Sequence, residues 1–571
     1  MTVQTPSCTS LSPPSTTGTK DALATFDPER PQAPAGNMLD KPSFRLPRWR
    51  RYVILFTVSW MTFVITFFST AFLTAMPEIS QEFSTTSEKI AATNSGVLIA
   101  MGFSSLFWIP IGRMIGRRWA YNSAIMFLCL CSIGTALSIN MAMFTAMRIL
   151  AGFTGTYFMV AGQSILADIF PPLVRGTAVG FFMAGSVSGP ALAPCIGGII
   201  VTYAHWRVIF WVQVGMAALS FVMAIFFVPD IEKINSVEKD SEKKEPPPSL
   251  LSVLYAMNPI RVFTFFAYPN IFFADLTCGL LAFFQYALLT SARSIFGPRF
   301  HLTTALVSGL FYLAPGAGFL VGSIVGGRLS DRTVKRYIQK RNGARLPQDR
   351  LNSGLLWVLT MLPASTLIYG WTLQEEVGGM AVPIISAFFA GWGLMGTFNG
   401  LNTYTAEVIP AQKTEVISGK YVVQYIFGAT ASAAVVPMIN SIGAGWTFTI
   451  CSAMFMIGGG LTFLVAKRGL DMQEAQGGFT MIYGISVFSP SPTMAVVSLI
   501  ERATAAGVRG IGGVGGPGVI RPRRHHNWAA RNPGVVLVFV IVFIVACGLI
   551  ALVLYRRWMA RKALKAAEAG A

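Results

Sequence analysis

Long apolar segments alternate with short polar ones over most of the chain. A helix needs about twenty consecutive apolar residues to cross a bilayer. Segments of this kind lie at 52–76, 91–112, 119–139, 141–167, 175–202, 207–228, 268–291, 303–327, 353–373, 378–403, 415–438 and 445–466. A polar interval from Pro229 to Ser249 separates the first six from the last six. The pattern therefore predicts an all-α membrane protein built from two six-helix bundles.

Composition agrees with this prediction. Of the 571 residues, 53 % are apolar and 12 % are charged, whereas soluble domains carry about 25 % charged residues. Such a chain cannot cover its surface with polar groups, so the surplus apolar side chains must face lipid. Residues 1–50 are rich in Pro, Ser and Thr and lack the apolar core of a signal peptide, which predicts a disordered arm.

Positive charge is concentrated in connections of one parity. The connections after segments 2 and 8 are rich in Arg and Lys, whereas those after segments 1 and 9 carry Glu. Short basic connections face the cytosol, so we expect the N terminus and the central linker to be cytosolic. This role accounts for the net charge of +19 without a nucleic-acid partner. The four His residues lack the spacing of a metal site.

These patterns predict five regions. They are a disordered cytosolic arm (1–50), a first bundle (51–229), a cytosolic linker (230–267), a second bundle (268–468) and a Gly-rich tail (469–571). Within the tail, residues 535–555 are long and apolar enough for a thirteenth span, but both flanks are basic, so its orientation stays open. An erroneous gene model or a fused extra segment explains the tail equally well.

Small residues form stripes in segments 5 and 8. They recur every four residues, which places each set on one face: Gly185, Gly189, Ala193 and Gly197; Gly176, Gly180, Ala184 and Ser188; Ala314, Gly318, Gly322 and Gly326. Small residues let membrane helices approach closely, and Pro190 and Pro194 predict a kink. The stripes indicate either a tightly packed helix pair or a seam between segments 5 and 8 on which the two bundles rock.

Several motifs resemble those of the major facilitator superfamily, most closely its fungal twelve-span drug:proton antiporter branch. The matching positions are Gly185, Gly189, Pro190, Gly197 and Gly198 in segment 5; Arg148, Gly152 and Gly155 in segment 4; Asp168 and Arg175 around the 4–5 loop; Gly116, Arg117 and Arg118 in the 2–3 loop; and Gly327, Asp331 and Arg332 after segment 8. In the 2–3 loop Arg113 stands where the family has Asp. We therefore expect the second half to hold most of the cytosolic gate, with Asp331 paired to Arg175.

The resemblance implies two bundles related by pseudo-twofold symmetry, in a monomer of the plasma membrane. It implies export of drugs or other small organic molecules in exchange for protons, with the proton gradient as energy source and no cofactor. Uptake or downhill facilitation of a small organic metabolite on the same fold is an alternative. A membrane enzyme would need a catalytic base or metal cluster at a membrane face, which the sequence lacks.

Two charged residues stand out within the predicted spans. A charge inside a bilayer costs about 2.5 kcal/mol or more and usually serves function. Arg148 and Asp275 are therefore the candidates for proton coupling, with Arg148 resetting the charge of the Asp275 carboxylate. Asp275 snorkelling to the interface and Arg148 bonding backbone carbonyls are the structural alternatives.

Uncharged polar and aromatic residues in the spans are candidates for lining a substrate cavity. They are Gln163, Gln285, Tyr286, Trp392, Asn399, Asn402, Gln424 and Tyr425. Each one by itself is also compatible with ordinary packing between helices. As a set they suit an amphipathic organic solute better than a phosphate or an inorganic ion.

Overall fold

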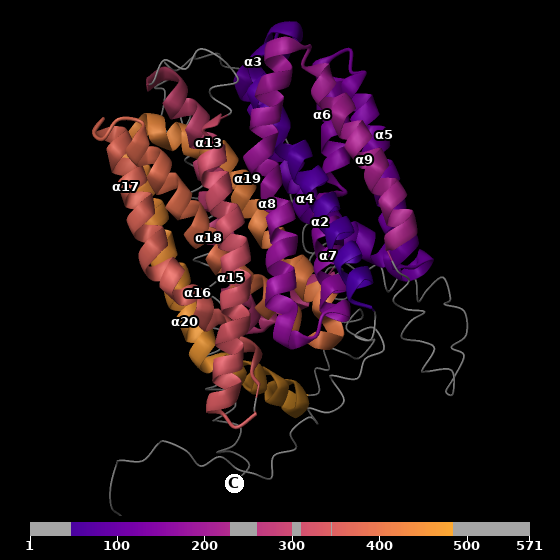
Figure 1. Ribbon diagram of the computed structural model, residues 1–571, viewed down its shortest axis with the longest axis vertical. Helices are drawn as coiled ribbons and strands as arrows, with labels where there is room; N and C mark the ends of the chain where they lie inside the picture. Colours follow the sequence, from indigo (N-terminus) through magenta and orange to yellow (C-terminus); the bar gives the residue numbers. More distant parts are fainter. Residues whose placement is uncertain (1–46, 229–259, 300–309, 344, 484–571) are drawn as a thin grey trace, which may run out of the picture. The chain divides into compact units, whose positions relative to one another are not determined.

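The computed structural model describes residues 47–228, 260–299, 310–343 and 345–483 (Figure 1). Most of the predicted arm and central linker, and the possible span at 535–555, lie outside these ranges. Within them, eleven helical segments are long and apolar enough to cross a membrane. α15 is a further long helix. It continues well past the predicted end of segment 8, at residue 327, into a strongly basic region.

The first half is formed by helices that follow the predicted segments 1 to 6. They are α2 (Arg48–Thr70), the 3-10 turn η2 (Ala71–Ala75), α3 (Met76–Glu82), α4 (Ser87–Ile115), α5 (Arg117–Ala136), α6 (Met141–Gly152), α7 (Gly155–Ile169), α8 (Pro172–Tyr203) and α9 (Arg207–Phe227). Segment 4 is divided into α6 and α7 beside Gly152 and Gly155. Pro190 and Pro194, by contrast, lie inside one unbroken helix, α8.

The second half follows the predicted segments 7 to 12. Its elements are α12 (Ile260–Phe263), η3 (Thr264–Ala267), α13 (Pro269–Arg299), α15 (Leu313–Lys340), η4 (Pro347–Leu351), α16 (Asn352–Leu356), the π-helical turn η5 (Trp357–Met361), α17 (Leu362–Gln374), α18 (Ala381–Glu407), η6 (Pro410–Gln412), α19 (Lys413–Ile442) and α20 (Ala444–Tyr483). Segment 9 is thus a composite of three elements, α16, η5 and α17, rather than one regular helix.

Three predicted boundaries need correction. The arm was expected to reach residue 50, but α2 begins at Arg48. The linker was expected to reach residue 267, but α12 and η3 already occupy its last residues. The tail was expected from residue 469, but α20 continues to Tyr483. Polar residues mark where a helix leaves the bilayer, and they do not by themselves end it.

Several helix pairs join the halves, and two of them make the most extensive contacts. α8 packs along α15, and α4 packs along α19; Figure 1 shows α8 and α15 side by side. Within the halves, α2 packs on α8, α13 on α19 and α15 on α18. α8, α15 and α19 therefore each contact both halves and position the residues described below.

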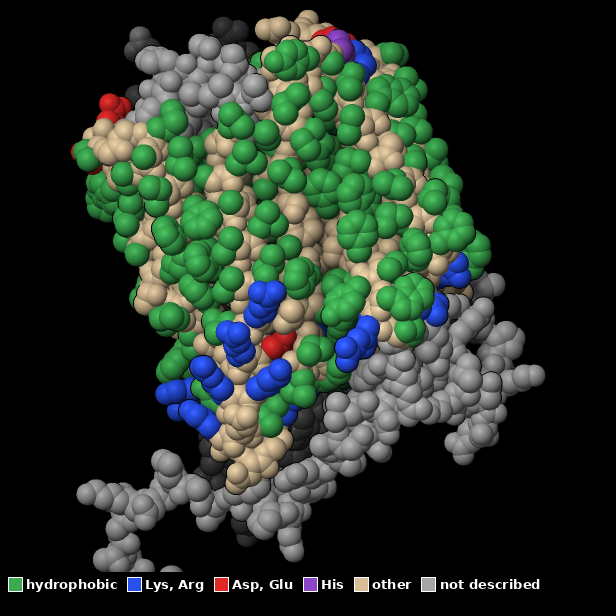
Figure 2. All heavy atoms as spheres, in the orientation of Figure 1, with side chains coloured by type: hydrophobic (Ala, Val, Ile, Leu, Met, Phe, Trp, Pro, Cys, Tyr) green, Lys and Arg blue, Asp and Glu red, His purple; other side chains and the backbone are tan. Residues whose placement is uncertain are grey.

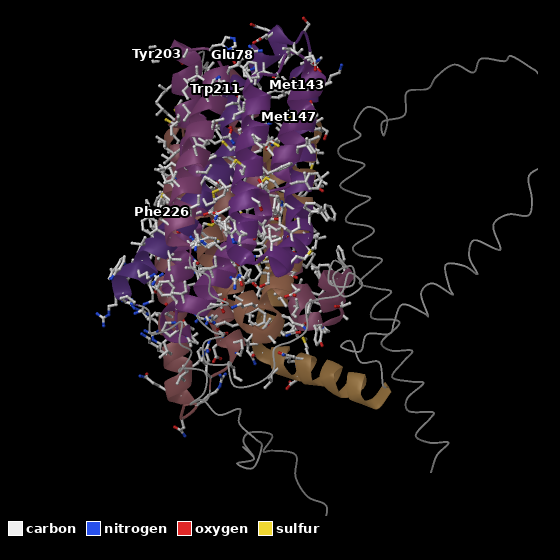
Figure 3. All side chains as sticks on the ribbon, turned by 90° about the vertical axis from the view of Figure 1, so that its right-hand side faces the viewer. Glu78, Met143, Met147, Tyr203, Trp211 and Phe226 are labelled. Carbon is white, nitrogen blue, oxygen red and sulfur yellow. The ribbon has the colours of Figure 1, made fainter. Side chains whose placement is uncertain are left out.

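The two ends of the helices differ in charge. Figure 2 shows Lys and Arg side chains gathered at one end beneath a broad apolar surface. We call this the basic end; it carries the exposed residues Arg328, Arg332, Lys335, Arg336 and Lys340 of α15. Figure 3 shows Glu78 and Tyr203 at the opposite end and Phe226 of α9 nearer the basic end. The apolar surface between the ends fits contact with lipid.

Candidate functional site

Helix α8 presents small residues on two faces. Toward the second half, a Cβ atom at Gly180 would lie 2.5 Å from the Ser323 carbonyl oxygen, and Gly327 packs against the backbone of Gly176 and Gly180. Farther along, Gly316 of α15 packs directly on Ala191. Segments 5 and 8 therefore pack closely along this face, as both interpretations of the stripes require.

The other face of α8 packs within its own half. A Cβ atom at Gly185 would lie 2.5 Å from the Ser59 carbonyl oxygen of α2, Gly189 packs on Thr66, and Gly197 on Ala71. Pro190 and Gly198 are also buried on α8. The stripe that matches the antiporter motif thus contacts α2 and η2, which corrects the expectation that it faces segment 8.

The predicted stripe of α15 is likewise internal to its half. Gly318 and Gly322 contact the backbone of α18 at Phe388 and Trp392, and Gly326 contacts Gly396. The contacts with α8 are made instead by Gly316 and Gly327, which are not part of the predicted stripe. A spacing of four residues identifies a face, but the sequence does not say which neighbour covers it.

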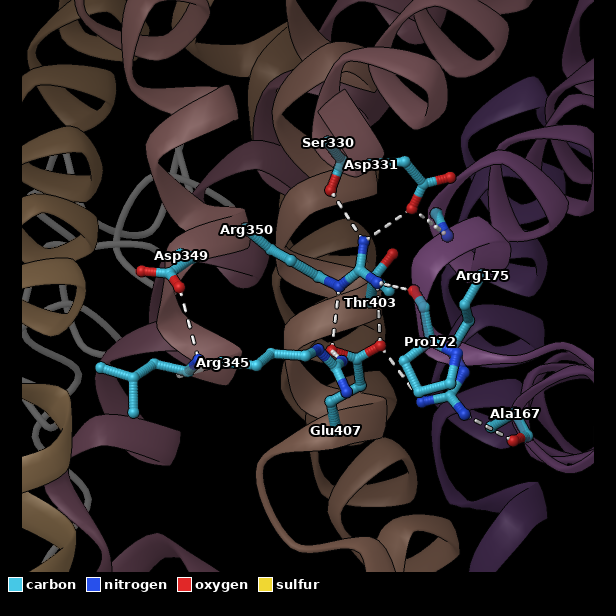
Figure 4. Close-up of polar contacts among 12 residues, drawn as sticks. Ala167, Pro172, Arg175, Ser330, Asp331, Arg345, Asp349, Arg350, Thr403 and Glu407 are labelled. Carbon is cyan, nitrogen blue, oxygen red and sulfur yellow. Dashed lines mark hydrogen bonds and ion pairs between the residues drawn. The ribbon is translucent and has the colours of Figure 1, made fainter. Parts of the chain in front are cut away.

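A network of charged side chains joins the halves at the basic end (Figure 4). Arg350 is fully buried at its centre. Its Nη1 donates to Asp331 Oδ1 at 3.0 Å, and its Nε and Nη2 donate to the two carboxylate oxygens of Glu407 at 2.9 and 3.0 Å. Nη2 also donates to the Pro172 carbonyl oxygen at 2.6 Å, at the start of α8. One guanidinium of the second half therefore binds the first half directly.

Arg175 of α8 completes this part of the network. Its Nη1 donates to Glu407 Oε1 at 3.1 Å, and its Nη2 donates to the Ala167 carbonyl oxygen at 2.8 Å. Arg345 also donates to Glu407, at 2.5 Å. Three arginines thus converge on one buried carboxylate, a geometry that offsets the loss of its hydration.

Asp331 binds backbone N–H groups near the start of α8 rather than Arg175. Its carboxylate accepts from Gly176 N at 2.9 Å and from Thr177 N at 2.7 Å. A helix N-terminus is a favourable site for an anion because its backbone N–H groups are free and its dipole is positive there. The predicted pair of Asp331 with Arg175 is therefore wrong, although both residues lie in the same network.

A second contact between the halves involves Asp168 at the end of α7. It forms ion pairs with Arg117, at 3.1 Å, and with Lys413 at the start of α19. Arg118 donates to the Ile225 carbonyl oxygen of α9. Gly116 has a φ of +86°, a conformation that favours glycine, and this lets α5 begin directly after α4. Arg332 is exposed at the same end.

The two predicted coupling residues have different surroundings. Arg148 is fully buried, with its guanidinium carbon 3.8 Å from the Phe72 ring centroid and 4.7 Å from that of Phe68. Asp275 on α13 is also fully buried, and neither of its carboxylate oxygens has a hydrogen-bond partner among the described residues. The charge that acts on Asp275 belongs to Lys420, not to Arg148.

Lys420 is the residue that our sequence reasoning missed. It lies five residues into the predicted segment 415–438 and is fully buried. Its Nζ donates to Asn402 Oδ1 at 2.5 Å and to Gln163 Oε1 at 3.5 Å, while Gln163 Nε2 donates to the Tyr421 hydroxyl at 2.7 Å. We call Gln163, Asn402, Lys420 and Tyr421 the Lys420 cluster. A Lys inside an apolar segment was the available signal.

The other cavity candidates are divided between the interface of the halves and the second half itself. Tyr425 donates from its hydroxyl to Met159 Sδ at 3.6 Å, and its ring lies 6.5 Å from that of Tyr286. Asn402 contacts Met183 of α8. Asn399 instead donates to the Ser323 carbonyl oxygen within the second half, at 2.5 Å. The remaining candidates, Gln285, Trp392 and Gln424, are half-buried.

No group of His, Cys, Asp or Glu within the described ranges has the arrangement needed to hold a metal ion. The charged groups of the basic end form ion pairs with one another and hydrogen bonds with backbone groups. What this arrangement can do is join or release two helical halves and hold charge inside a membrane.

The sequence model of the Major Facilitator Superfamily matches residues 58–419. The chain belongs to this superfamily. It is 24 % identical over 426 residues to "Uncharacterized transporter mfc1" of Schizosaccharomyces pombe, covering 69 % of this chain and 85 % of the relative. It is 26 % identical over 445 residues to "Efflux pump radE" of Floropilus chiversii (72 % and 79 %), and 21 % identical over 558 residues to "MFS antiporter QDR3" of Candida albicans (75 % and 79 %).

Solved structures of superfamily members share the fold. The human organic anion transporter MFSD10 matches with a TM-score of 0.54 and 14 % identity, covering 73 % of this chain and all of that one. The proton:xylose symporter XylE matches with a TM-score of 0.57 and 13 % identity, covering 73 % and 96 %. The predicted all-α fold of two six-helix bundles is thereby confirmed. The protein is a multi-pass membrane transporter of the superfamily and resembles its fungal drug-efflux branch. It lies in a lipid bilayer, and its substrate is a small molecule.

Proposed function

We propose that the protein exports drugs or secondary metabolites from the cytosol in exchange for protons. Two named relatives, an efflux pump and an antiporter, support the direction and the exchange. The aromatic and amide side chains of the predicted cavity set support an amphipathic organic substrate. We place this activity in the plasma membrane and assign it to a monomer.

The basic end is proposed to face the cytosol. Short basic connections remain on that side of a membrane. With this orientation the network around Arg350 and Glu407 closes the cytosolic side in the described conformation. Alternating access then requires these contacts to break once per cycle.

The observation that carries the proposal is the carboxyl group of Asp275. It is fully buried in a membrane helix, and neither oxygen has a hydrogen-bond partner among the described residues. An isolated buried charge is strongly unfavourable, so the group suits reversible binding of a proton. Binding of a proton on one side of the membrane and its release on the other would drive exchange of protons for substrate.

Transport of a chemically diverse set of fluorescent cations, anions and neutral amphiphiles by purified protein in proteoliposomes tests the proposal. We expect accumulation of at least one compound against its gradient when a pH gradient is imposed, and none without it. Asp275→Asn should lose accumulation, because its amide cannot bind and release a proton. Transport that ignores the pH gradient in both orientations would instead favour a facilitator.

A further inference from the structure

Lys420 lies at the junction between the halves and contacts no acid among the described residues. Its two hydrogen-bond acceptors, Asn402 Oδ1 and Gln163 Oε1, are neutral amides, and its Nζ lies 3.7 Å from the centroid of the Tyr421 ring. Gln163 belongs to α7 of the first half, whereas Asn402 and Lys420 belong to α18 and α19 of the second. The ammonium group therefore forms a bond across the interface.

Asp275 offers Lys420 a second partner within its own half. α13, which carries Asp275, packs along α19, and the two charges act on each other although no ion pair joins them in the described structure. Cys278 on α13 also interacts electrostatically with both groups, and Tyr404 on α18 interacts with Asp275.

The protonation state of Asp275 determines whether Lys420 binds the two amides or the Asp275 carboxylate. Lys carries three donors on a long, rotatable stem. A hydrogen bond from an ammonium group to a carboxylate is stronger than one to a neutral amide. A protonated Asp275 leaves Lys420 with Asn402 and Gln163, which is the arrangement observed. An ionised Asp275 attracts the ammonium group away from Gln163.

We propose that Lys420 couples the protonation state of Asp275 to a contact between the two halves. When the Asp275 carboxyl releases its proton to water, Lys420 breaks its N–H···O contact with Gln163 and forms one with the carboxylate. Gln163 then keeps only Tyr421 as its partner in the second half. Proton release thereby loosens the α7–α19 contact, and proton binding restores it.

This inference deepens the proposed proton exchange and rests on it for its role in transport. The effect of Asp275 protonation on the α7–α19 contact can be tested separately from transport, because it can be measured without a substrate. Hydrogen–deuterium exchange of the full chain in detergent micelles, corrected for the intrinsic effect of pH, reports the opening of helix contacts. The readout is the exchange of peptides from α7 and α19 between mildly acidic and mildly alkaline pH.

We expect exchange at α7 and the first turns of α19 to rise roughly tenfold or more as pH increases, since a hydrogen bond to a charged group is worth at least that factor. Asp275→Asn should stay protected at every pH. Lys420→Met should be open at every pH. Thr430→Val is the matched control, because the Thr430 hydroxyl donates only to Ile426 of its own helix, and it should keep the wild-type response.

An absence of pH dependence at α7 and α19 in the wild type would overturn the inference, as would a wild-type response in Lys420→Met. Should Lys420→Met fail to fold, the double variant Asp275→Asn/Lys420→Met contains neither buried charge and must show pH-independent exchange. If the exchange results hold while no compound is accumulated in proteoliposomes, the proposed export fails and the proton-linked contact remains.

Discussion

Single charged side chains inside the membrane have very different surroundings in this protein. Arg148 lies among four phenylalanine rings, Phe68, Phe72, Phe144 and Phe210, with one long bond of 3.5 Å to the Phe68 carbonyl oxygen. Asp275 has no hydrogen-bond partner among the described residues. These surroundings suit a packing role for Arg148 and the proton-binding role that we propose for Asp275.

Arg148→Ala tests this division. The substitution removes the cation–π contacts, each worth up to about 2 kcal/mol when desolvated, and leaves a cavity between the rings. We expect a lower thermal unfolding midpoint in detergent together with reduced transport. Asp275→Asn should leave the midpoint near that of the wild type. Equal midpoints for Arg148→Ala and wild type would argue against the packing role.

Arg350 links more groups than any other residue of the basic end that we describe. Arg350→Met keeps the approximate volume but leaves Asp331 and Glu407 without their shared cation. Because Glu407 retains Arg175 and Arg345, we expect a loss of about 2–3 kcal/mol. Chemical or thermal unfolding in micelles measures this loss in the free energy of unfolding. The exposed Arg336 on α15 supplies the control, and Arg336→Met should change the unfolding free energy by less than about 1 kcal/mol.

At the scale of elements, α8 is the helix that belongs to two interfaces. Its Gly176 and Gly180 face α15 across the halves. Within the first half, Gly185 and Gly189 face α2, and Gly197 faces η2. Lipid supplies no hydrophobic driving force between helices, so such contacts depend on close backbone approach. The two faces should therefore respond differently to added bulk.

We expect both Gly180→Leu and Gly189→Leu to abolish transport while the protein still reaches the membrane. Gly189→Leu separates α8 from α2, so thermal stability should fall. Gly180→Leu separates α8 from α15, so the first turns of α8 should exchange amide hydrogens faster while the α2–α8 contact stays protected. Indistinguishable exchange patterns in the two variants would contradict the assignment of the two faces.

At the scale of the whole molecule, the two halves are joined by charges at the basic end and by small residues along α8 and α15. Most of the charged groups come from the second half, namely Asp331, Arg345, Arg350, Glu407 and Lys413. This distribution agrees with the absence of the usual acid in the first-half loop. The first half contributes Arg117, Asp168 and Arg175.

Exchange of the charges at Asp168 and Lys413 tests one contact between the halves. Asp168→Lys and Lys413→Asp should each reduce transport, and the double variant should recover part of it. A double-mutant cycle on unfolding should give a coupling energy of about 0.5–3 kcal/mol. The recovery should be incomplete because Arg117 also binds Asp168. A double variant no better than either single one would show that the pair does not join the halves.

Both bundles and the charge network lie within residues 47–483. A chain ending after Tyr483 should therefore transport as the full chain does, measured per molecule of protein in proteoliposomes. The shortened chain retains the whole of α20, which ends at Tyr483. Loss of transport by a correctly inserted shortened chain would show that later residues take part.

The membrane spans, the two halves and the small-residue faces could be predicted because they depend on local composition. An apolar run of sufficient length must form a helix in a bilayer, where backbone groups find no water. The same reasoning indicated that Arg148 and Asp275 are unusual. Lys420 carried the same signal, and its place near the start of a segment concealed it.

The partners of these residues depended on how distant helices are rotated and packed. Arg175 binds Glu407, 232 residues away, and Asp331 binds the start of α8 rather than Arg175. Charge complementarity alone allows many pairings among the cations and carboxylates of the basic end. Only the packing of α8 against α15 and of α7 against α19 brings particular groups within hydrogen-bond distance. The packing energy that selects this arrangement comes from contacts between residues far apart in the chain, so local sequence patterns do not reveal it.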